Sequence, residues 1–321
     1  MTARLIETLF APAFRNPYLE PLGDGAVVTV GSERLAFTTD TFVVKPIFFP
    51  GGDIGSLAVH GTVNDLAMCG AEPLFLSAGY VLEEGFPMRD LERVVASMAE
   101  ACTRVGVALV TGDTKVVDRG KGDGIYVNTS GVGRVREGVT VGPNRAAAGD
   151  AVIVSGPVGD HGIAVMAARE GIDFETSLVS DSAPVVAPVR ALLDVAPHTH
   201  VLRDPTRGGL ATALCEIALS SNVGIRLEED EIPVRDEVRG ACELLGFDPL
   251  YVACEGRFLA IVPGARAEAA LAAIRSQPGG ESARRIGSVV AEDPGRLVLR
   301  TRIGSHRLLE RLSGEQLPRI C

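Results

Sequence analysis

The sequence predicts an α+β protein built from two domains. The chain has 321 residues, and at roughly 100–200 residues per domain this length suits two domains. Both halves mix alternating segments with helical segments, without the strict strand–helix–strand order of a doubly wound sheet. Residues 142–150 are rich in glycine and alanine and separate the halves. We therefore expect domains over residues 1–145 and 146–311, followed by a tail over 312–321.

The first half predicts a strand-rich domain. Residues 26–30 and 34–44 alternate and are rich in Val, Thr and Phe, which is typical of strands. The clearest helix spans 88–105, where apolar residues recur every three or four positions and Gly106 follows as a C-terminal cap. The other expected elements are a helix over 54–70 and strands near 74–82, 107–111 and 125–135.

The second half predicts a mixed domain and a tail. We expect strands near 151–155, 223–228, 257–263 and 284–290, and helices near 161–170, 184–195, 208–221, 235–245 and 265–276. The residues from 313 onward show no periodicity and contain Gly and Pro, so they predict a mobile tail.

Composition excludes several functional classes. The net charge is −10, aromatic residues are 5% and Trp is absent, which argues against nucleic-acid binding. No apolar run is long enough for a membrane span, and the N-terminus does not resemble a signal peptide. The six cysteines form no CxxC pair, so we expect a cytoplasmic chain with reduced thiols, no zinc site and no disulfides.

Aspartates in the first half suggest a Mg²⁺–nucleotide site. Asp65 falls inside an apolar helical segment, where a bare carboxylate is costly unless it is paired or bound to metal. Mg²⁺ prefers carboxylates together with phosphate oxygens. Each Asp beside Gly is also typical of an ordinary turn. Taken together, Asp40, Asp65 and Asp113 favour metal binding, although the familiar phosphate loops GxxxxGK[ST] and GxGxxG are absent.

Polar residues elsewhere leave two interpretations open. Asp204 and Arg207 precede a predicted helix, and this segment either binds an anion or caps the helix. Lys115 either neutralises a transferring phosphoryl group or is a surface lysine. Glu255 interrupts an apolar segment, and it is either a base with a raised pKa or a paired carboxylate at the end of a strand. His161 either lines a pocket or begins a helix.

Cys321 is the terminal residue, which is unusual for so rare an amino acid. The α-carboxylate should raise the pKa of its thiol, so we expect a thiol that another agent modifies, unless it stands there by chance. Residues 314–321 reach at most ~26–29 Å when extended, at ~3.3–3.6 Å each. This is long enough for the thiol to enter a pocket of its own domain or to meet a partner.

A set of motifs in a fixed order resembles one known family. The motifs are Thr38-Thr39-Asp40, residues 49–55, residues 61–67, residues 112–117, residues 204–210 and the terminal Pro318-Arg319-Ile320-Cys321. Together they resemble the HypE family of hydrogenase-maturation carbamoyl dehydratases, in the aminoimidazole-ribonucleotide-synthetase (PurM-like) superfamily. The resemblance covers nearly the whole chain.

This resemblance implies a fold, cofactors and site residues. It implies an N-terminal α/β domain that pairs strands across a homodimer, a C-terminal α+β domain, and ATP with Mg²⁺ near the dimer interface. The implied metal or phosphate residues are Asp40, Asp65 and Asp113, and the implied catalytic residues are Cys321, Glu255 and Lys115. The implied nucleotide-binding residues are Asp24, Gly51, Gly52, Asp53, Asn64, Gly112, Thr114, His161, Asp204, Arg207, Gly208 and Gly209. One departure is Cys254, where the family usually has Asn.

The resemblance also implies a reaction and partners. A carbamoyl transferase would load Cys321, and ATP-dependent dehydration would turn the S-carbamoyl group into S-cyanide. An iron-bearing scaffold complex would then accept cyanide for [NiFe]-hydrogenase. One alternative is another enzyme of the superfamily acting on a free substrate, such as a selenophosphate synthetase or a kinase. The other is a non-catalytic module that presents its tail for docking. The terminal Cys321 favours the dehydratase over the other enzymes, because a selenophosphate synthetase or a kinase that acts on a free substrate needs no C-terminal thiol.

Overall fold

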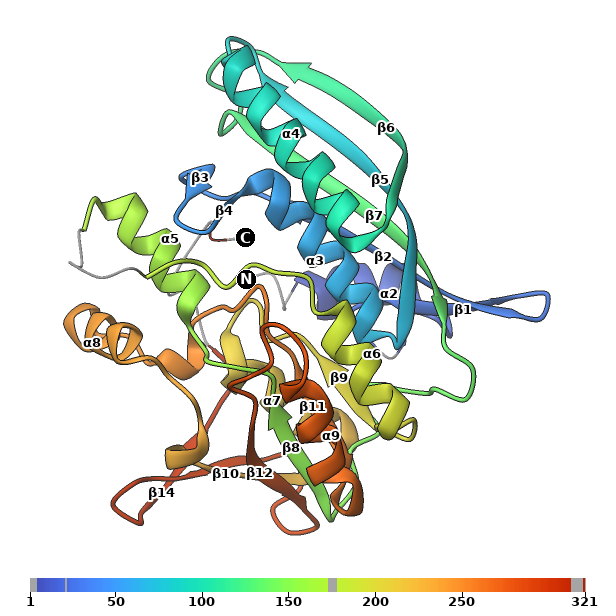
Figure 1. Ribbon diagram of the computed structural model, residues 1–321, viewed down its shortest axis with the longest axis vertical. Helices are drawn as coiled ribbons and strands as arrows, with labels where there is room; N and C mark the ends of the chain where they lie inside the picture. The colour runs from blue at the N-terminus through green and yellow to red at the C-terminus, as the bar shows by residue number, and fades with distance from the viewer. Residues whose placement is uncertain (1–4, 21, 173–177, 313–319, 321) are drawn as a thin grey trace.

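The computed structural model describes residues 5–20, 22–172, 178–312 and 320. Figure 1 shows two units, one from the N-terminal half of the chain and one from the C-terminal half. Helices α3 (Ile54–Met68) and α6 (Val186–Val195) come from different halves and contact each other where the units meet. Each unit is a sheet with helices against it, so the fold has the mixed α+β character that the sequence predicts.

The N-terminal unit is a five-stranded sheet. The strand order is β1-β2-β7-β5-β6, and all neighbours are antiparallel except the parallel pair β5 and β6. Helix α3 contacts β2, β5 and β7, and α4 packs on α3. The bounds are β1 Ala26–Val30, β2 Glu33–Phe42, β5 Ala71–Glu83, α4 Met88–Val105, β6 Ala108–Val117 and β7 Ile125–Val135.

Helix α3 is enclosed almost completely. Most of its residues are apolar or small, and all but Ser56 and Asp65 are buried, which is the pattern of a buried helix rather than of a surface helix. Strand β7 presents alternate residues to it, as the two-residue period of a strand requires. A side chain at Gly131 of β7 would place its Cβ 2.9 Å from atoms of Leu66 and Thr62. Glycine at this position therefore allows the helix to lie close against the sheet.

The C-terminal unit is a seven-stranded sheet in the order β14-β13-β10-β12-β8-β11-β9. Strand β8 lies inside it and is buried along its whole length. Helix α9 contacts β8, β11 and β12, while α7 contacts β10 and β13. The bounds are β8 Asp150–Val154, α5 Asp160–Glu170, β9 Val201–Arg203, α7 Gly209–Ser221, β10 Gly224–Glu228, α8 Asp236–Leu245, β11 Leu259–Pro263, α9 Ala267–Arg275, β12 Arg284–Val290, β13 Leu297–Arg300 and β14 His306–Leu309.

The remaining elements are short. A two-stranded hairpin precedes α3, and brief helical turns begin the chain and connect the larger elements. They are η1 Ile6–Phe10, α2 Ala11–Ala13, β3 Phe48–Phe49, β4 Gly52–Asp53, η2 Glu229–Glu231, η3 Pro249–Tyr251 and η4 Gly264–Arg266. None of the helices in the described residues combines the length and the apolar character that a membrane span needs.

The longer predicted elements agree with the structure, and the differences concern short or exposed strands. Helix 88–105 and strand 125–135 have the expected bounds. Strands β9, β13 and β14 are absent from the prediction, because three or four residues are too few to show a period. Strand β6 continues to Val117 rather than ending near residue 111. It lies at the sheet edge and is exposed, so its sequence has no buried face to impose alternation.

Asn64 links α3 to the C-terminal unit. Its side-chain Nδ2 donates to the carbonyl oxygens of Ala183 (3.0 Å) and Glu255 (3.3 Å). Its Oδ1 accepts from the backbone N–H of Val185 (2.8 Å). The amide is buried, so these three bonds replace all its contact with water. The family resemblance implies a nucleotide contact for Asn64, whereas in the structure its amide groups serve the contact between the two units.

We expect Asn64→Ala to destabilise the fold by about 3 kcal/mol, because it leaves two carbonyls and one N–H buried without their partner. The melting temperature should fall by roughly 5 °C. Asn144→Ala is the matched control, since Asn144 is exposed in the segment between the units. Differential scanning calorimetry measures both variants. Equal melting temperatures for the two would show that Asn64 does not hold the units together.

Candidate active site

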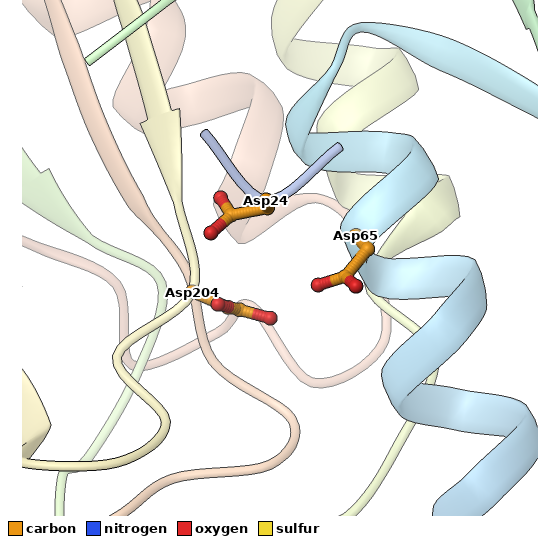
Figure 2. A group of neighbouring side chains, drawn as sticks. All are labelled: Asp24, Asp65 and Asp204. Atoms are coloured by element: carbon orange, nitrogen blue, oxygen red, sulfur yellow. The ribbon is translucent and has the colours of Figure 1, made fainter. Parts of the chain in front are cut away.

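Three aspartates meet where the two units come together. Asp24 precedes β1, Asp65 lies on α3 and Asp204 follows β9. A ligand atom of each lies within 4.8 Å of those of the other two. Figure 2 shows the three side chains directed into one common space from three separate segments. The site therefore exists only when the N-terminal and C-terminal halves are folded against each other.

Burial and mutual repulsion favour the protonated forms of these carboxyls. Burial raises the pKa of Asp204 to about 8, with the charge of Asp24 adding to the effect. Burial likewise raises the pKa of Asp24 to about 6, although Arg203 opposes the shift through an ion pair at 2.7 Å. The pKa of Asp65 is raised well above its usual value by burial and then by Asp204 and Asp24.

The cluster has the chemistry of a divalent-cation site. Three carboxylates face one another, and the guanidinium of Arg203 forms an ion pair with one of them. A hard cation with oxygen ligands, such as Mg²⁺, would replace the protons that otherwise keep these groups from repelling each other. Thr38 holds Asp65 in place, because its hydroxyl donates to Asp65 Oδ2 at 2.8 Å. The residues present thus fit Mg²⁺.

The two other aspartates of the predicted metal set lie in different surroundings. Asp40 on β2 is near the cluster, since its charge raises the pKa of Asp65 and of Asp204. Its own pKa is raised by burial. Asp113 lies on the exposed strand β6, where Lys115 forms an ion pair with it at 3.1 Å and its side chain is 72% exposed. The structure thus groups Asp65 with Asp24 and Asp204, and places Asp113 on a different surface of the same chain.

Glu255 is buried beside the acidic cluster. Its pKa is raised well above the usual value by burial, followed by the charges of Asp204 and Asp40. Its Oε1 has no hydrogen-bond partner among the described residues. Asp181 accepts a hydrogen bond from the Glu255 backbone N–H at 3.1 Å, which fixes the main chain here. A buried carboxyl with an unpartnered oxygen beside a candidate cation site is suited to proton transfer.

Cys254 occupies the position where the resembled family usually has Asn. The thiol is fully buried, and its sulfur accepts a hydrogen bond from the backbone N–H of Gly159 at 3.2 Å. Burial raises the pKa of this thiol well above its usual value. Cys254 therefore satisfies a backbone donor at the start of α5 and is not a reactive nucleophile.

Several residues that the resemblance implies for nucleotide binding also have structural roles in the described part of the chain. Asp53 is the N-cap of α3, where its Oδ1 accepts from Gly55 N (2.7 Å) and Ser56 N (3.1 Å). Gly208, which has no side chain, is the N-cap of α7, so the alternative in which the segment with Asp204 and Arg207 caps that helix is wrong. Gly209 has φ +62°, and a Cβ there would lie 2.7 Å from two carbonyl oxygens.

The remaining predicted residues fall into three groups. Gly112 and Thr114 lie with Asp113 on exposed β6. Arg207 is exposed, and its charge lowers the pKa of both Asp40 and Glu255, which places it near the cluster. Gly51 and Gly52 belong to the β3–β4 hairpin segment that precedes α3. Cys321 lies outside the described residues.

His161 is fully buried at the start of α5, which agrees with its expected place at the beginning of a helix. Its Nε2 lies 2.6 Å from the carbonyl oxygen of Ile320 and its Nδ1 lies 2.8 Å from Ser180 Oγ. Sequence reasoning misses both contacts, because no spacing in the chain relates positions 161, 180 and 320.

Comparisons with known proteins agree with this architecture. Residues 22–135 match the family model of the N-terminal domain of AIR synthase related proteins, and residues 147–300 match the model of the C-terminal domain. A carbamoyl dehydratase HypE from Azotobacter vinelandii is 52% identical over 99% of this chain and 93% of its own length. The carbamoyl dehydratase HypE of Escherichia coli K12 is 44% identical over 99% of this chain and 95% of its own.

This chain belongs to the HypE family. Its fold is the PurM-like two-domain fold of that family, as expected from the sequence. A HypE solved in complex with ATP has a TM-score of 0.88 and 50% identity, covering 100% of this chain and 96% of its own. The structure of a HypE–HypF complex matches with a TM-score of 0.92 and 46% identity, covering 96% and 99%. A thiamine monophosphate kinase from Aquifex aeolicus matches with a TM-score of 0.69 at 19% identity, covering 96% of this chain and 99% of its own, which shows the shared fold alone.

We expect the metal-free protein to lose stability as pH rises from about 4 to about 8, with the loss levelling off above pH 8. Asp204 has a pKa of about 8 in the folded state against 3.8 for the ordinary carboxyl, so the folded state holds the extra proton in this range. The melting temperature in EDTA should fall by a few degrees, and added Mg²⁺ should restore it most at high pH, where the carboxyls are ionised.

The matched variants are Asp204→Asn and Asp118→Asn, the latter at an exposed position. Asp204→Asn should flatten the pH profile and remove the effect of Mg²⁺, whereas Asp118→Asn should change neither. A profile for Asp204→Asn that matches the wild type would mean that the cluster does not govern this titration.

Proposed function

We propose that this protein is an ATP-dependent carbamoyl dehydratase that converts an S-carbamoyl group on its own Cys321 into S-cyanide. The product supplies cyanide for the iron of [NiFe]-hydrogenase. The observation that carries the proposal is the buried acidic cluster with Glu255 beside it, in a chain about 50% identical over its whole length to proteins named carbamoyl dehydratase HypE. The HypE solved with ATP supports ATP as the second substrate.

The acidic cluster is the proposed site of Mg²⁺. Asp24, Asp65 and Asp204 would hold the ion, with Asp40 nearby. When bound, Mg²⁺ supplies positive charge to the phosphate groups of ATP during phosphoryl transfer. The chain itself orients the carboxylates, through Thr38 on Asp65 and Arg203 on Asp24. Arg207, exposed near Asp40 and Glu255, is placed to contact a phosphate group.

The proposed reaction balances in two stages. The carbamoyl oxygen attacks the γ-phosphorus of ATP, ADP leaves, and one N–H proton is lost, which gives an S-bound imidate phosphate ester. The second N–H proton then leaves as the C–O bond breaks, and phosphate departs with the oxygen. The products are S-cyanide, ADP and phosphate. Phosphorylation is needed because an amide oxygen is otherwise a poor leaving group.

Glu255 is the proposed proton acceptor. A carboxyl whose pKa is raised by burial is a stronger base, once ionised, than a carboxylate in water. Its Oε1 has no hydrogen-bond partner among the described residues, which leaves a lone pair available for a substrate N–H. The backbone of Glu255 is fixed by Asp181 and by Asn64, so the side chain starts from a defined position.

A homodimer would explain the location of Lys115. Lys115 and Asp113 lie on β6, an edge strand that is exposed along almost its whole length and carries Leu109, Val110 and Val116 on the surface. An edge strand of ten residues with apolar side chains is a template for pairing with another chain. We infer that β6 pairs across a dimer, so that Lys115 and Asp113 approach the phosphate groups held by the second chain.

The partners and organisation follow the same proposal. The HypE–HypF structure supports a carbamoyl transferase that loads Cys321. An iron-bearing maturation scaffold would accept the cyanide, in the cytoplasm. The two sheets and the two family matches support domains over 1–145 and 146–311, with 312–321 as the tail that carries the reacting thiol.

We expect Glu255→Gln to slow carbamoyl-dependent ATP turnover by about 10²–10⁴-fold, the usual contribution of a positioned general base. The dissociation constant of ATP should stay within about twofold, because Gln preserves the shape of the side chain. The assay is single-turnover phosphate release from protein loaded by the transferase, with ATP affinity measured by calorimetry.

Cys321→Ser is the reference variant in the same assay. It should bind ATP normally but show no carbamoyl-dependent turnover at all. If Cys321→Ser turned over ATP as the wild type does, the tail would not carry the substrate. If Glu255→Gln weakened ATP binding as much as turnover, the base role of Glu255 would be wrong.

A further inference from the structure

The penultimate residue of the chain is docked on the body of the protein. Ile320 is only 5% exposed and belongs to the same hydrophobic cluster as Phe49 and Val185. Its carbonyl oxygen lies 2.6 Å from Nε2 of His161, a residue 159 positions earlier in the chain. Both an apolar contact and a buried hydrogen bond therefore hold this residue, as expected of a built binding site.

The hydrogen bonds around His161 have one consistent direction. A carbonyl can only accept, so His161 Nε2 carries the hydrogen that Ile320 receives. Burial lowers the pKa of His161, so the ring is neutral and its Nδ1 is an acceptor. The Ser180 hydroxyl, 2.8 Å away, donates to Nδ1 and accepts in turn from the backbone N–H of Ser182 at 3.0 Å. Both ring nitrogens of His161 thus have a partner, and the ring orientation is fixed.

The segments around the His161 ring are held together by a hydrogen bond and by close packing. The Ser180 backbone N–H donates to the carbonyl oxygen of Pro50 at 2.8 Å. Gly51 has φ +91°, and a Cβ there would lie 2.8 Å from both Ser180 N and Ser180 O. Phe49 presents its ring to His161 at right angles, with centroids 5.5 Å apart. The β3–β4 hairpin thus packs against both Ser180 and His161, which explains why glycine is required at position 51.

The segment that orients His161 also holds the proposed base. Asp181 follows Ser180 directly, and its Oδ1 accepts from the Glu255 backbone N–H at 3.1 Å. Asp181 also forms an ion pair with Arg257 at 3.5 Å. Three consecutive residues, 180–182, therefore connect the docked end of the chain to the main chain of Glu255.

We propose that His161, oriented by Ser180, is a positioning residue that docks the tail through the Ile320 carbonyl and so delivers the terminal thiol to the reaction site. This inference rests on the proposed function. Cys321 lies outside the described residues, and it follows the docked Ile320 directly in the sequence. Both ring nitrogens of His161 are engaged by Ser180 and Ile320, so His161 serves the tail rather than the nucleotide.

The test compares His161→Phe with His161→Gln in the full-length protein. Phe keeps a ring of similar size but cannot donate, whereas the amide of Gln can still donate to the Ile320 carbonyl. The exposed His198→Phe is the control for the substitution itself. The first readout is the rate of alkylation of Cys321 by iodoacetamide, followed by the mass of the C-terminal peptide. The other five cysteines are buried, so they do not compete.

The second and third readouts are single-turnover loss of water from the carbamoylated tail with Mg-ATP, and the affinity for ATP. His161→Phe should speed alkylation about threefold to tenfold, as expected for the loss of one hydrogen bond, and slow water loss about tenfold. ATP affinity should stay within about twofold. In His161→Gln, the alkylation rate and the rate of water loss should both return most of the way to their wild-type values. His198→Phe should match the wild type.

If His161→Phe does not fold, Ile320→Ala is the second variant, because this substitution alters only the docked end of the chain. Ile320→Ala should also speed the alkylation of Cys321. Unchanged alkylation and water loss in His161→Phe or Ile320→Ala would overturn the docking role. Equal loss of ATP affinity in both His161 variants would instead assign the ring to the nucleotide. If even the wild type never loses water with ATP, the proposed function fails, while the alkylation rates still decide whether His161 holds the tail.

Discussion

The burial of α3 is the constraint on which the rest of the structure depends. On a helix that is almost completely enclosed, a polar side chain is costly unless other segments satisfy it. Two of the polar side chains on α3 are the consecutive Asn64 and Asp65. Asn64 bonds to backbone groups of the C-terminal unit, and Asp65 faces Asp204 from that same unit. The same turn of α3 therefore provides both the link between the two units and one member of the acidic cluster.

The electrostatic state of the cluster follows from that arrangement. Carboxyls that are buried together raise one another's pKa, and the nearby Glu255 responds to the same charges. Any cation or phosphate that enters this space therefore changes the protonation of several groups at once. Under the proposed function, this site would couple nucleotide binding to the ionisation of Glu255 without any change in fold.

The sequence is informative where chemistry shows as a local pattern. The long helix 88–105 and strand 125–135 are predictable because each has one buried face that imposes a period. Asp65 is recognisable as a carboxylate within an apolar helix. The partners of Asp65 are not, because Asp24 is distant from it in the sequence and Asp204 reaches it only through the packing of the C-terminal unit on the N-terminal unit. The same limit applies to His161 and Ile320, whose contact no local spacing encodes.

Some polar residues that the family resemblance implies as ligand contacts also form hydrogen bonds within the fold. Asp53 caps α3 and Asn64 joins the two units. In both cases the same hydrogen-bonding capacity that suits a phosphate suits an unpaired backbone group, and only the three-dimensional neighbours distinguish the two. Asp113 and Lys115 lie on an exposed strand of the single chain, so the role implied for them rests on the proposed dimer.

The most direct test of the account is the mass of the C-terminal peptide after the protein has been loaded by its carbamoyl transferase. The proposed dehydratase activity predicts a carbamoyl adduct on Cys321 that loses the mass of one water when Mg-ATP is added and keeps that mass when ATP is withheld. A Cys321 that stays unmodified beside an active transferase, or an adduct that ATP does not change, would contradict it.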